Sequence, residues 1–135
     1  MNKLHLKIVT PEKEIFDGEV DEVLVTTEQG EIGILPNHEN LMSKIVAGEL
    51  RYKDGNQTKV MVTGSGLLQV VNNTLSVLTD LVENESEIDV KAAEEARNRA
   101  QAALEQTLSD EEYAETIAIL EKSLAKIRVK RRHHT

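Results

Sequence analysis

Residues 67 to 79 read LLQVVNNTLSVLT, two short apolar runs on either side of an Asn-Asn pair. Asparagine tolerates the left-handed backbone that a tight hairpin turn requires, and short runs rich in Leu and Val favour strands. The stretch therefore predicts a β-hairpin, and it sets the pattern for the N-terminal part of the chain.

Similar runs fill the chain on both sides of this hairpin, up to about residue 84. Apolar residues alternate with polar ones at 4–8 and form short runs at 22–27 and 59–64, while Asp54-Gly55 is a second hairpin signal. Glycines separate the runs. Several short strands at intervals of roughly 8 to 12 residues predict a sandwich or barrel, and we expect an antiparallel β-sandwich over residues 1–84.

One segment of this part has an unusual composition. Residues 30–41 read GEIGILPNHENL, which places an apolar run directly against a proline, a histidine and two asparagines. We interpret the segment as a turn that is too short to be a core element. An apolar run fixed by proline and rimmed by Glu31, His38 and Glu39 has the composition of a small protein contact. Alternatively, the apolar residues plug the sandwich end; we expect this of Ile34, and contact roles for the flanking polar residues.

The composition changes after Glu85. Glycine and proline disappear, and Ala, Glu, Leu, Lys and Arg dominate, which is typical of helices. Asp89 is a candidate N-cap for a first helix, and Ser109 to Glu112 form a capping box that predicts the start of a second. Residues 85–135 therefore predict an antiparallel two-helix hairpin joined near 106–109, and the whole chain an α+β fold.

The two predicted helices carry apolar stripes of different size. The first has mainly alanines on its stripe, whereas the second has Tyr113, Ile117, Leu120, Leu124 and Ile127. A buried alanine methyl group contributes only about 0.8 kcal/mol. The sequence leaves two interpretations open: a hairpin held loosely enough to detach, as a switch requires, or an ordinary stable hairpin.

The net charge of −8 predicts repulsion from nucleic acid and anionic lipid, and only three aromatic residues are present to stack on bases. The charge is unevenly distributed, because residues 122–135 carry six basic residues and no acidic one. Cations at a helix C-terminus complement the helix dipole. The alternative is a site for phosphate or for an acidic partner.

Several classes of function are disfavoured. The chain has no cysteine, which excludes disulfides and thiolate chemistry and suits a reducing compartment. The four histidines lack metal-ligand spacing, and no nucleophile or phosphate-loop motif occurs, so we expect no metal site and no enzyme active site. No apolar run approaches the roughly 20 residues that span a bilayer, so we expect no direct membrane insertion.

Taken together, these features resemble the epsilon subunit of bacterial ATP synthase. The resemblance rests on LHLKIVTPEKEIFDGEVDEV at 4–23, GEIGILPNH at 30–38, GSGLLQV at 64–70 and the helical hairpin. It implies a non-catalytic central-stalk subunit, peripheral to the cytoplasmic face of the bacterial cell membrane, in a proton-translocating enzyme. The sandwich would bind the gamma subunit and the c subunits of the rotor ring, through an interface that includes Glu31, Pro36 and His38.

The resemblance also implies a regulatory role for the hairpin. Extended along the gamma shaft, its basic second helix would meet acidic loops of the catalytic alpha and beta subunits and inhibit ATP hydrolysis. The absence of acidic neighbours favours such a contact, because a negative surface would attract these side chains. The implied contact residues are Lys122, Lys126, Arg128, Lys130, Arg131 and Arg132.

Members of this family also carry a nucleotide site with the pattern I/L-D-x-x-R-A, which here reads IDVKAA at 88–93, so that Ala92 replaces the arginine. Losing one charge-assisted hydrogen bond costs roughly 1.5 to 3 kcal/mol, or about 10-fold to 150-fold in affinity. We therefore expect no required cofactor and ATP only as a weak regulatory ligand or none, which leaves nucleotide sensing as the alternative function. The resemblance implies that Lys122 and Lys126 stand where the best ATP binders of the family have arginines. The positions that match the family's nucleotide-contacting residues are Glu83, Ile88, Asp89, Ala93 and Arg99.

Overall fold

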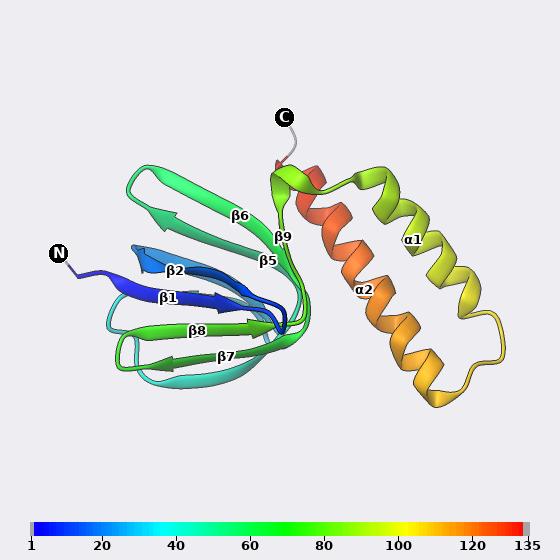
Figure 1. Ribbon diagram of the computed structural model, residues 1–135, viewed down its shortest axis with the longest axis horizontal. Helices are drawn as coiled ribbons and strands as arrows, with labels where there is room; N and C mark the ends of the chain where they lie inside the picture. Colours follow the sequence, from blue (N-terminus) through cyan, green and yellow to red (C-terminus); the bar gives the residue numbers. More distant parts are fainter. Residues whose placement is uncertain (1, 134–135) are drawn as a thin grey trace. The chain divides into compact units, whose positions relative to one another are not determined.

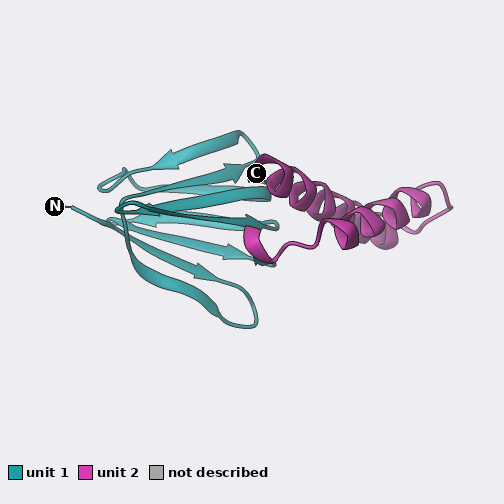
Figure 2. Ribbon diagram, turned by 90° about the horizontal axis from the view of Figure 1, so that it is seen from above, with its two compact units in different colours: residues 1–84 teal, residues 85–135 magenta. Residues whose placement is uncertain are grey.

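A computed structural model describes residues 2–133 of the chain, which divide into two compact units after Asn84 (Figure 2). Met1 and residues 134–135, the outer ends of the two expected domains, lie outside the described residues. The first unit consists of strands and the second of helices. The expected fold class, an α+β chain with a β-sandwich followed by a two-helix hairpin, is confirmed.

The strands of the first unit form one continuous hydrogen-bonded sheet in the order β2-β1-β8-β7-β5-β3-β4, with β6 beside β5 and β9 beside β6. The long strand β5 pairs with β7 through residues 41–45 and with β6 through residues 48–54, so it joins the two parts of the sandwich. In chain order the strands are β1 (Leu4–Val9), β2 (Glu14–Val20), β3 (Glu22–Thr27), β4 (Gly30–Ile34), β5 (Leu41–Asp54), β6 (Gln57–Thr63), β7 (Gly66–Val71), β8 (Thr74–Thr79) and β9 (Val82–Asn84).

The pairing is antiparallel with one exception among the described strands. β1 and β8 run parallel, with His5 opposite Thr74 and Val9 opposite Leu78, and their arrows point the same way in Figure 1. The hairpins at Asp54-Gly55 and Asn72-Asn73 are confirmed. The backbone of Asn72 and Asn73 has φ values of 48° and 63°, the conformation for which asparagine was expected.

The core of the sandwich is aliphatic, as the alternating pattern predicted. Leu4, Leu6 and Ile8 of β1 are completely buried, and alternate residues of the neighbouring strands meet them. A period of two places every second side chain on the same face of a strand. The other buried core residues are Val20, Val23, Val25, Ile34, Ile45, Leu50, Met61, Leu68, Val70, Leu75 and Val77.

The interpretation of residues 30–41 as a turn is wrong for their first five residues. A tight turn over residues 27–30 leads into the strand β4: the Thr27 hydroxyl donates to the Gly30 carbonyl (2.7 Å), and Gly30 has a φ of 113°. This turn aligns β4 with β3 as an antiparallel hairpin. Ile34 lies in the core as expected, whereas Leu35 is 56% exposed, so the run supplies both a core residue and a surface residue.

A three-residue ion cluster ties β1 to two turns of the sandwich. The Lys3 ammonium lies 2.9 Å from the Asp21 carboxylate and 3.0 Å from that of Asp54, and the Gly55 amide donates to Asp21 at 2.6 Å. The Lys3 hydrogen bond, followed by that of the Gly55 amide, lowers the pKa of Asp21 below its ordinary value of 3.8. The same cluster raises the pKa of Lys3 above 10.5, with Asp21 as the largest cause.

The cluster predicts a pH dependence of unfolding. Because the pKa of Asp21 is lower in the folded state, its contribution to stability is present above pH 3.8 and is lost as the pH falls through the folded value. We therefore expect Asp21→Asn to weaken the loss of stability below about pH 4. Urea unfolding at neutral and at acid pH measures this, with Glu12→Gln, an exposed carboxylate, as the control. An unchanged acid dependence in Asp21→Asn would contradict the assignment.

The second unit contains the 3-10 helix η1 (Glu85–Glu87) and the helices α1 (Val90–Ala103) and α2 (Asp110–His133). Both predicted helix starts are confirmed. The Asp89 carboxylate accepts a hydrogen bond from the Ala92 amide at 3.1 Å. The Ser109 hydroxyl accepts from the Glu112 amide at 3.1 Å, while the Glu112 carboxylate accepts from the Ser109 amide at 2.9 Å, which lowers the pKa of Glu112.

Removing the cap hydroxyl should loosen the start of α2. We expect Ser109→Ala to destabilise the first turn of α2 by about 1 kcal/mol, because the Glu112 amide loses its acceptor. Hydrogen exchange of the amides at 110–113 would report this as faster exchange. Thr107→Ala, an exposed substitution in the loop before the helix, is the matched control. Equal exchange rates in the two variants would show that the cap contributes little.

Candidate functional site

The turn at residues 35–40 is fixed to the neighbouring β7–β8 turn by asparagine side chains. The backbone amide of Asn37 donates to the side-chain oxygen of Asn73 at 2.7 Å. The backbone amide of Asn72 donates to the side-chain oxygen of Asn40 at 3.2 Å. The Asn73 side chain in turn donates to the Lys3 carbonyl at 2.7 Å. These bonds between distant segments hold the two turns together as one surface at the end of the sandwich.

The structure places two of the three predicted contact residues of the sandwich in this turn. Pro36 and His38 are half-buried there, whereas Glu31 is exposed on β4. The imidazole Nδ1 of His38 lies 2.8 Å from the Glu39 carbonyl, so Nδ1 is the donor in this contact. Their role as partner contacts remains a prediction.

A larger apolar surface lies on the outer face of the sheet, and it was not predicted. Cross-strand pairing aligns Leu67 of β7, Leu78 of β8 and Val9 of β1 in one row. Leu67 is 45% exposed, Leu78 49%, and Met42 on β5 66%. We call Val9, Met42, Leu67 and Leu78 the contact face. Its signal in the sequence was the doubled Leu67-Leu68, in which only the second leucine points into the core.

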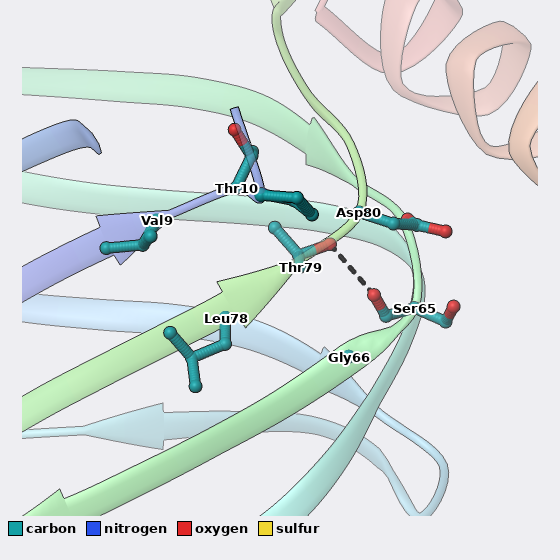
Figure 3. A pocket seen from close by; sticks show the side chains of 8 residues that line it. Val9, Thr10, Ser65, Gly66, Leu78, Thr79 and Asp80 are labelled. Carbon is teal, nitrogen blue, oxygen red and sulfur yellow. Dashed lines mark hydrogen bonds between the residues drawn. The ribbon is translucent and has the colours of Figure 1, made fainter. Parts of the chain in front are cut away.

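A hollow of about 410 Å³ adjoins the contact face where β1 and β8 end and β7 begins (Figure 3). Its walls include Val9, Pro11 and Leu78, and the Thr79 hydroxyl donates to the Ser65 carbonyl at 3.1 Å beside it. Gly66 is required here, because a Cβ on this residue would lie 1.9 Å from the Leu78 carbonyl oxygen. The sheet therefore presents an apolar depression next to an apolar row.

The predicted basic residues lie together on the last turns of α2. Arg128, Arg131 and Arg132 are exposed, and Lys122, Lys126 and Lys130 are half-buried. The Lys130 ammonium donates to the Glu85 carbonyl at 3.0 Å and lies 3.5 Å from its carboxylate, and Arg131 lies 3.4 Å from the Glu94 carboxylate. The basic end of α2 is therefore held against η1 and α1.

Half of the predicted nucleotide-site residues fall at the start of α1. Ile88 and Ala93 are buried, Asp89 caps the helix and Ala92 is exposed in its first turn. Arg99 is exposed and lies six residues after Ala93, which is about 9 Å farther along α1 at roughly 1.5 Å per residue. Lys122 and Lys126 lie on α2, and Glu83 lies on β9 opposite Val62 of β6. A ligand role for these residues remains a prediction.

Metal binding and membrane crossing find no support in residues 2–133. In this part of the chain, no three His, Asp or Glu side chains lie close enough together to hold a metal ion. Neither α1 nor α2 combines the length and the apolar character that crossing a bilayer requires.

The fold and these surfaces define a two-unit protein, a β-sandwich with an apolar contact face followed by a helical hairpin with a basic end. Residues 3–85 match the family described as ATP synthase, Delta/Epsilon chain, beta-sandwich domain, and residues 86–131 match its long alpha-helix domain. The chain belongs to the ATP synthase delta/epsilon chain family, and the resemblance to epsilon subunits is confirmed.

Relatives and solved structures agree with this assignment. The ATP synthase epsilon chain of Dehalococcoides mccartyi is 39% identical over 137 residues, covering 99% of this chain and 98% of that one. The epsilon chain of Syntrophobacter fumaroxidans is 35% identical over 127 residues, covering 94% and 95%.

Two solved structures share the fold. One is the mitochondrial ATP synthase of Euglena gracilis, described as OSCP/F1/c-ring, with a TM-score of 0.80 at 20% identity, covering 93% of this chain and 79% of that one. The other is the central stalk and c-ring of the Tetrahymena thermophila enzyme, with a TM-score of 0.69 at 14% identity and coverages of 93% and 95%.

Proposed function

We propose that this chain is the epsilon subunit in the central stalk of a proton-translocating ATP synthase, at the cytoplasmic face of a bacterial membrane. In this role it has no reaction of its own. The sandwich binds the gamma subunit and the rotor ring, which couples rotation of the ring to the shaft. The names of its relatives and the assemblies that contain its structural neighbours support this role.

The exposed contact face is the observation that carries the proposal for the sandwich. Leu67, Leu78 and Met42 are among the largest exposed apolar side chains of the first unit, and two of them lie directly opposite each other on adjacent strands. Exposed apolar side chains that gather on one face of a small protein mark a candidate partner interface. Charged side chains at Lys7, Glu14 and Asp17 on β1 and β2 provide a polar rim beside it.

The basic end of α2 supports a second part of the proposal, inhibition of ATP hydrolysis. Lys122, Lys126, Arg128, Lys130, Arg131 and Arg132 would meet acidic loops of the catalytic alpha and beta subunits when the hairpin extends along the shaft. Complementary charge of this kind speeds association and selects a partner. Because the exposed arginines are screened by salt, the inhibition should weaken at high ionic strength.

Hydrolysis by the catalytic subunits with gamma tests the inhibitory role. We expect the unmodified chain to suppress ATP hydrolysis, and the double variant Arg128→Glu/Arg132→Glu to suppress it much less. The double variant Lys59→Glu/Lys91→Glu makes the same charge change at exposed positions outside the basic end and should inhibit like the unmodified chain. If the unmodified chain does not suppress hydrolysis, the inhibitory role is wrong, and only the coupling role is left.

A further inference from the structure

Lys130 and Arg131 of the basic end of α2 each contact a carboxylate at the open end of the hairpin, the end away from the loop at 104–109. The Lys130 ammonium reaches back across 45 residues to the carbonyl and the carboxylate of Glu85. One residue farther, the Arg131 guanidinium meets the Glu94 carboxylate. Both contacts join α2 to the segment that begins the second unit.

The two contacts differ in strength. The side chains of Lys130 and Glu85 are 21% and 22% exposed, so water and salt screen this pair less than a surface pair, and the ammonium also has a main-chain acceptor. The Arg131 and Glu94 side chains are 66% and 37% exposed, and such pairs contribute little. Of these two contacts, that of Lys130 is therefore the stronger.

The remainder of the α1 surface offers little to hold α2. Its buried residues are Ala93 and Ala100, and each methyl group removes little apolar area from water. On α2, Tyr113 and Ile119 in the half nearer the loop are 54% and 50% exposed, and the buried residues lie in the other half. With so little apolar area buried by α1, a charge contact at the open end has a large share in deciding whether the helices stay together.

We propose that Lys130 and Arg131 form a latch with Glu85 and Glu94, which keeps the hairpin closed and keeps the two cations from an acidic partner. While the hairpin is closed, the carboxylates of Glu85 and Glu94 partly neutralise these two cations, which weakens their attraction to another carboxylate. Opening the hairpin therefore also makes Lys130 and Arg131 available to an acidic partner. This last consequence rests on the inhibitory role proposed above, whereas the latch itself does not.

The separation of the helices tests the latch in the full chain. Since the sequence lacks cysteine, Lys91→Cys and Glu121→Cys provide two exposed sites for spin labels, one on each helix. We expect Lys130→Gln to raise the ratio of open to closed hairpin about 10-fold, as for the loss of one charge-assisted hydrogen bond. Arg128→Gln removes the same charge from an exposed neighbour and should leave the distance distribution unchanged. Identical distributions in the two variants would overturn the proposal.

A second pair of variants separates the latch from the inhibitory role. Glu85→Gln with Glu94→Gln weakens the latch but keeps every cation of α2, so it should open the hairpin and inhibit ATP hydrolysis several-fold more strongly. The control variant Glu85→Gln with Glu95→Gln keeps the contact between Arg131 and Glu94. It should open the hairpin less than Glu85→Gln with Glu94→Gln does. Opening without stronger inhibition would support the latch and contradict the inhibitory role. A hairpin that stays closed in all these variants would refute the latch itself.

Discussion

Replacing Leu78 with aspartate should lower the affinity of this chain for its gamma subunit by about 30-fold to 1,000-fold, the effect of losing a central apolar anchor worth about 2 to 4 kcal/mol. Leu78 is 49% exposed in the middle of the row that it forms with Leu67 and Val9. A carboxylate there would be buried without a partner on binding, which adds a desolvation cost. The sandwich itself should remain folded, because this side chain points away from the core.

Binding of the purified chain to gamma, measured by calorimetry, would check this. Gln57→Asp is the matched control, since it also adds a carboxylate to an exposed strand position, at the far end of the β5–β6 hairpin. Unfolding curves of both variants should overlay that of the unmodified chain. If Leu78→Asp binds gamma as tightly as Gln57→Asp does, the contact face is not the gamma interface.

Replacing Ala92 with arginine should raise the affinity for ATP by about 10-fold to 150-fold. Ala92 is exposed in the first turn of α1, where the helix dipole favours phosphate. The backbone amide of residue 92 donates to the Asp89 carboxylate, and a side-chain substitution leaves this cap in place. The added guanidinium would supply the hydrogen-bond donors to phosphate that alanine lacks. The unmodified chain should show weak or no binding.

Calorimetry with ATP in the low-millimolar range would distinguish these cases. Ala102→Arg places the same side chain on the same helix, at an exposed position in its last turn, and should not bind. A clear saturable isotherm for the unmodified chain would contradict the expectation of weak binding. Ala92→Arg binding no better than Ala102→Arg would show that the site lacks more than one arginine.

The sequence predicted the strands that combine alternation with a clear turn, and it missed those that lack either signal. β3 and β8 coincide with the runs recognised at 22–27 and 74–79. The long strand β5 was missed because glycine normally marks a turn, whereas Gly48 lies inside it. A Cβ at Gly48 would lie 2.7 Å from the Thr26 hydroxyl, so this glycine serves the close approach of β3.

The candidate site was predicted in part for a similar reason. The basic end of α2 and the caps at Asp89 and Ser109 depend on neighbours within a few residues, and local patterns encode them. The contact face depends on the register of β7, β8 and β1, which brings together residues almost 70 positions apart. The contact between Lys130 and Glu85 likewise requires the tertiary pairing of two segments.

The parallel pairing of β1 with β8 has a consequence for how this chain folds as it is synthesised. β1 cannot pair with β8 until residues as far along the chain as Thr74, the partner of His5, have been synthesised. The sandwich therefore has a high contact order, and its closure costs a large loop-closure entropy. The hairpin, made of local contacts, can form quickly once translated. A nascent chain stalled before residue 74 would thus expose one edge of β1, a surface on which chaperones act and aggregation begins.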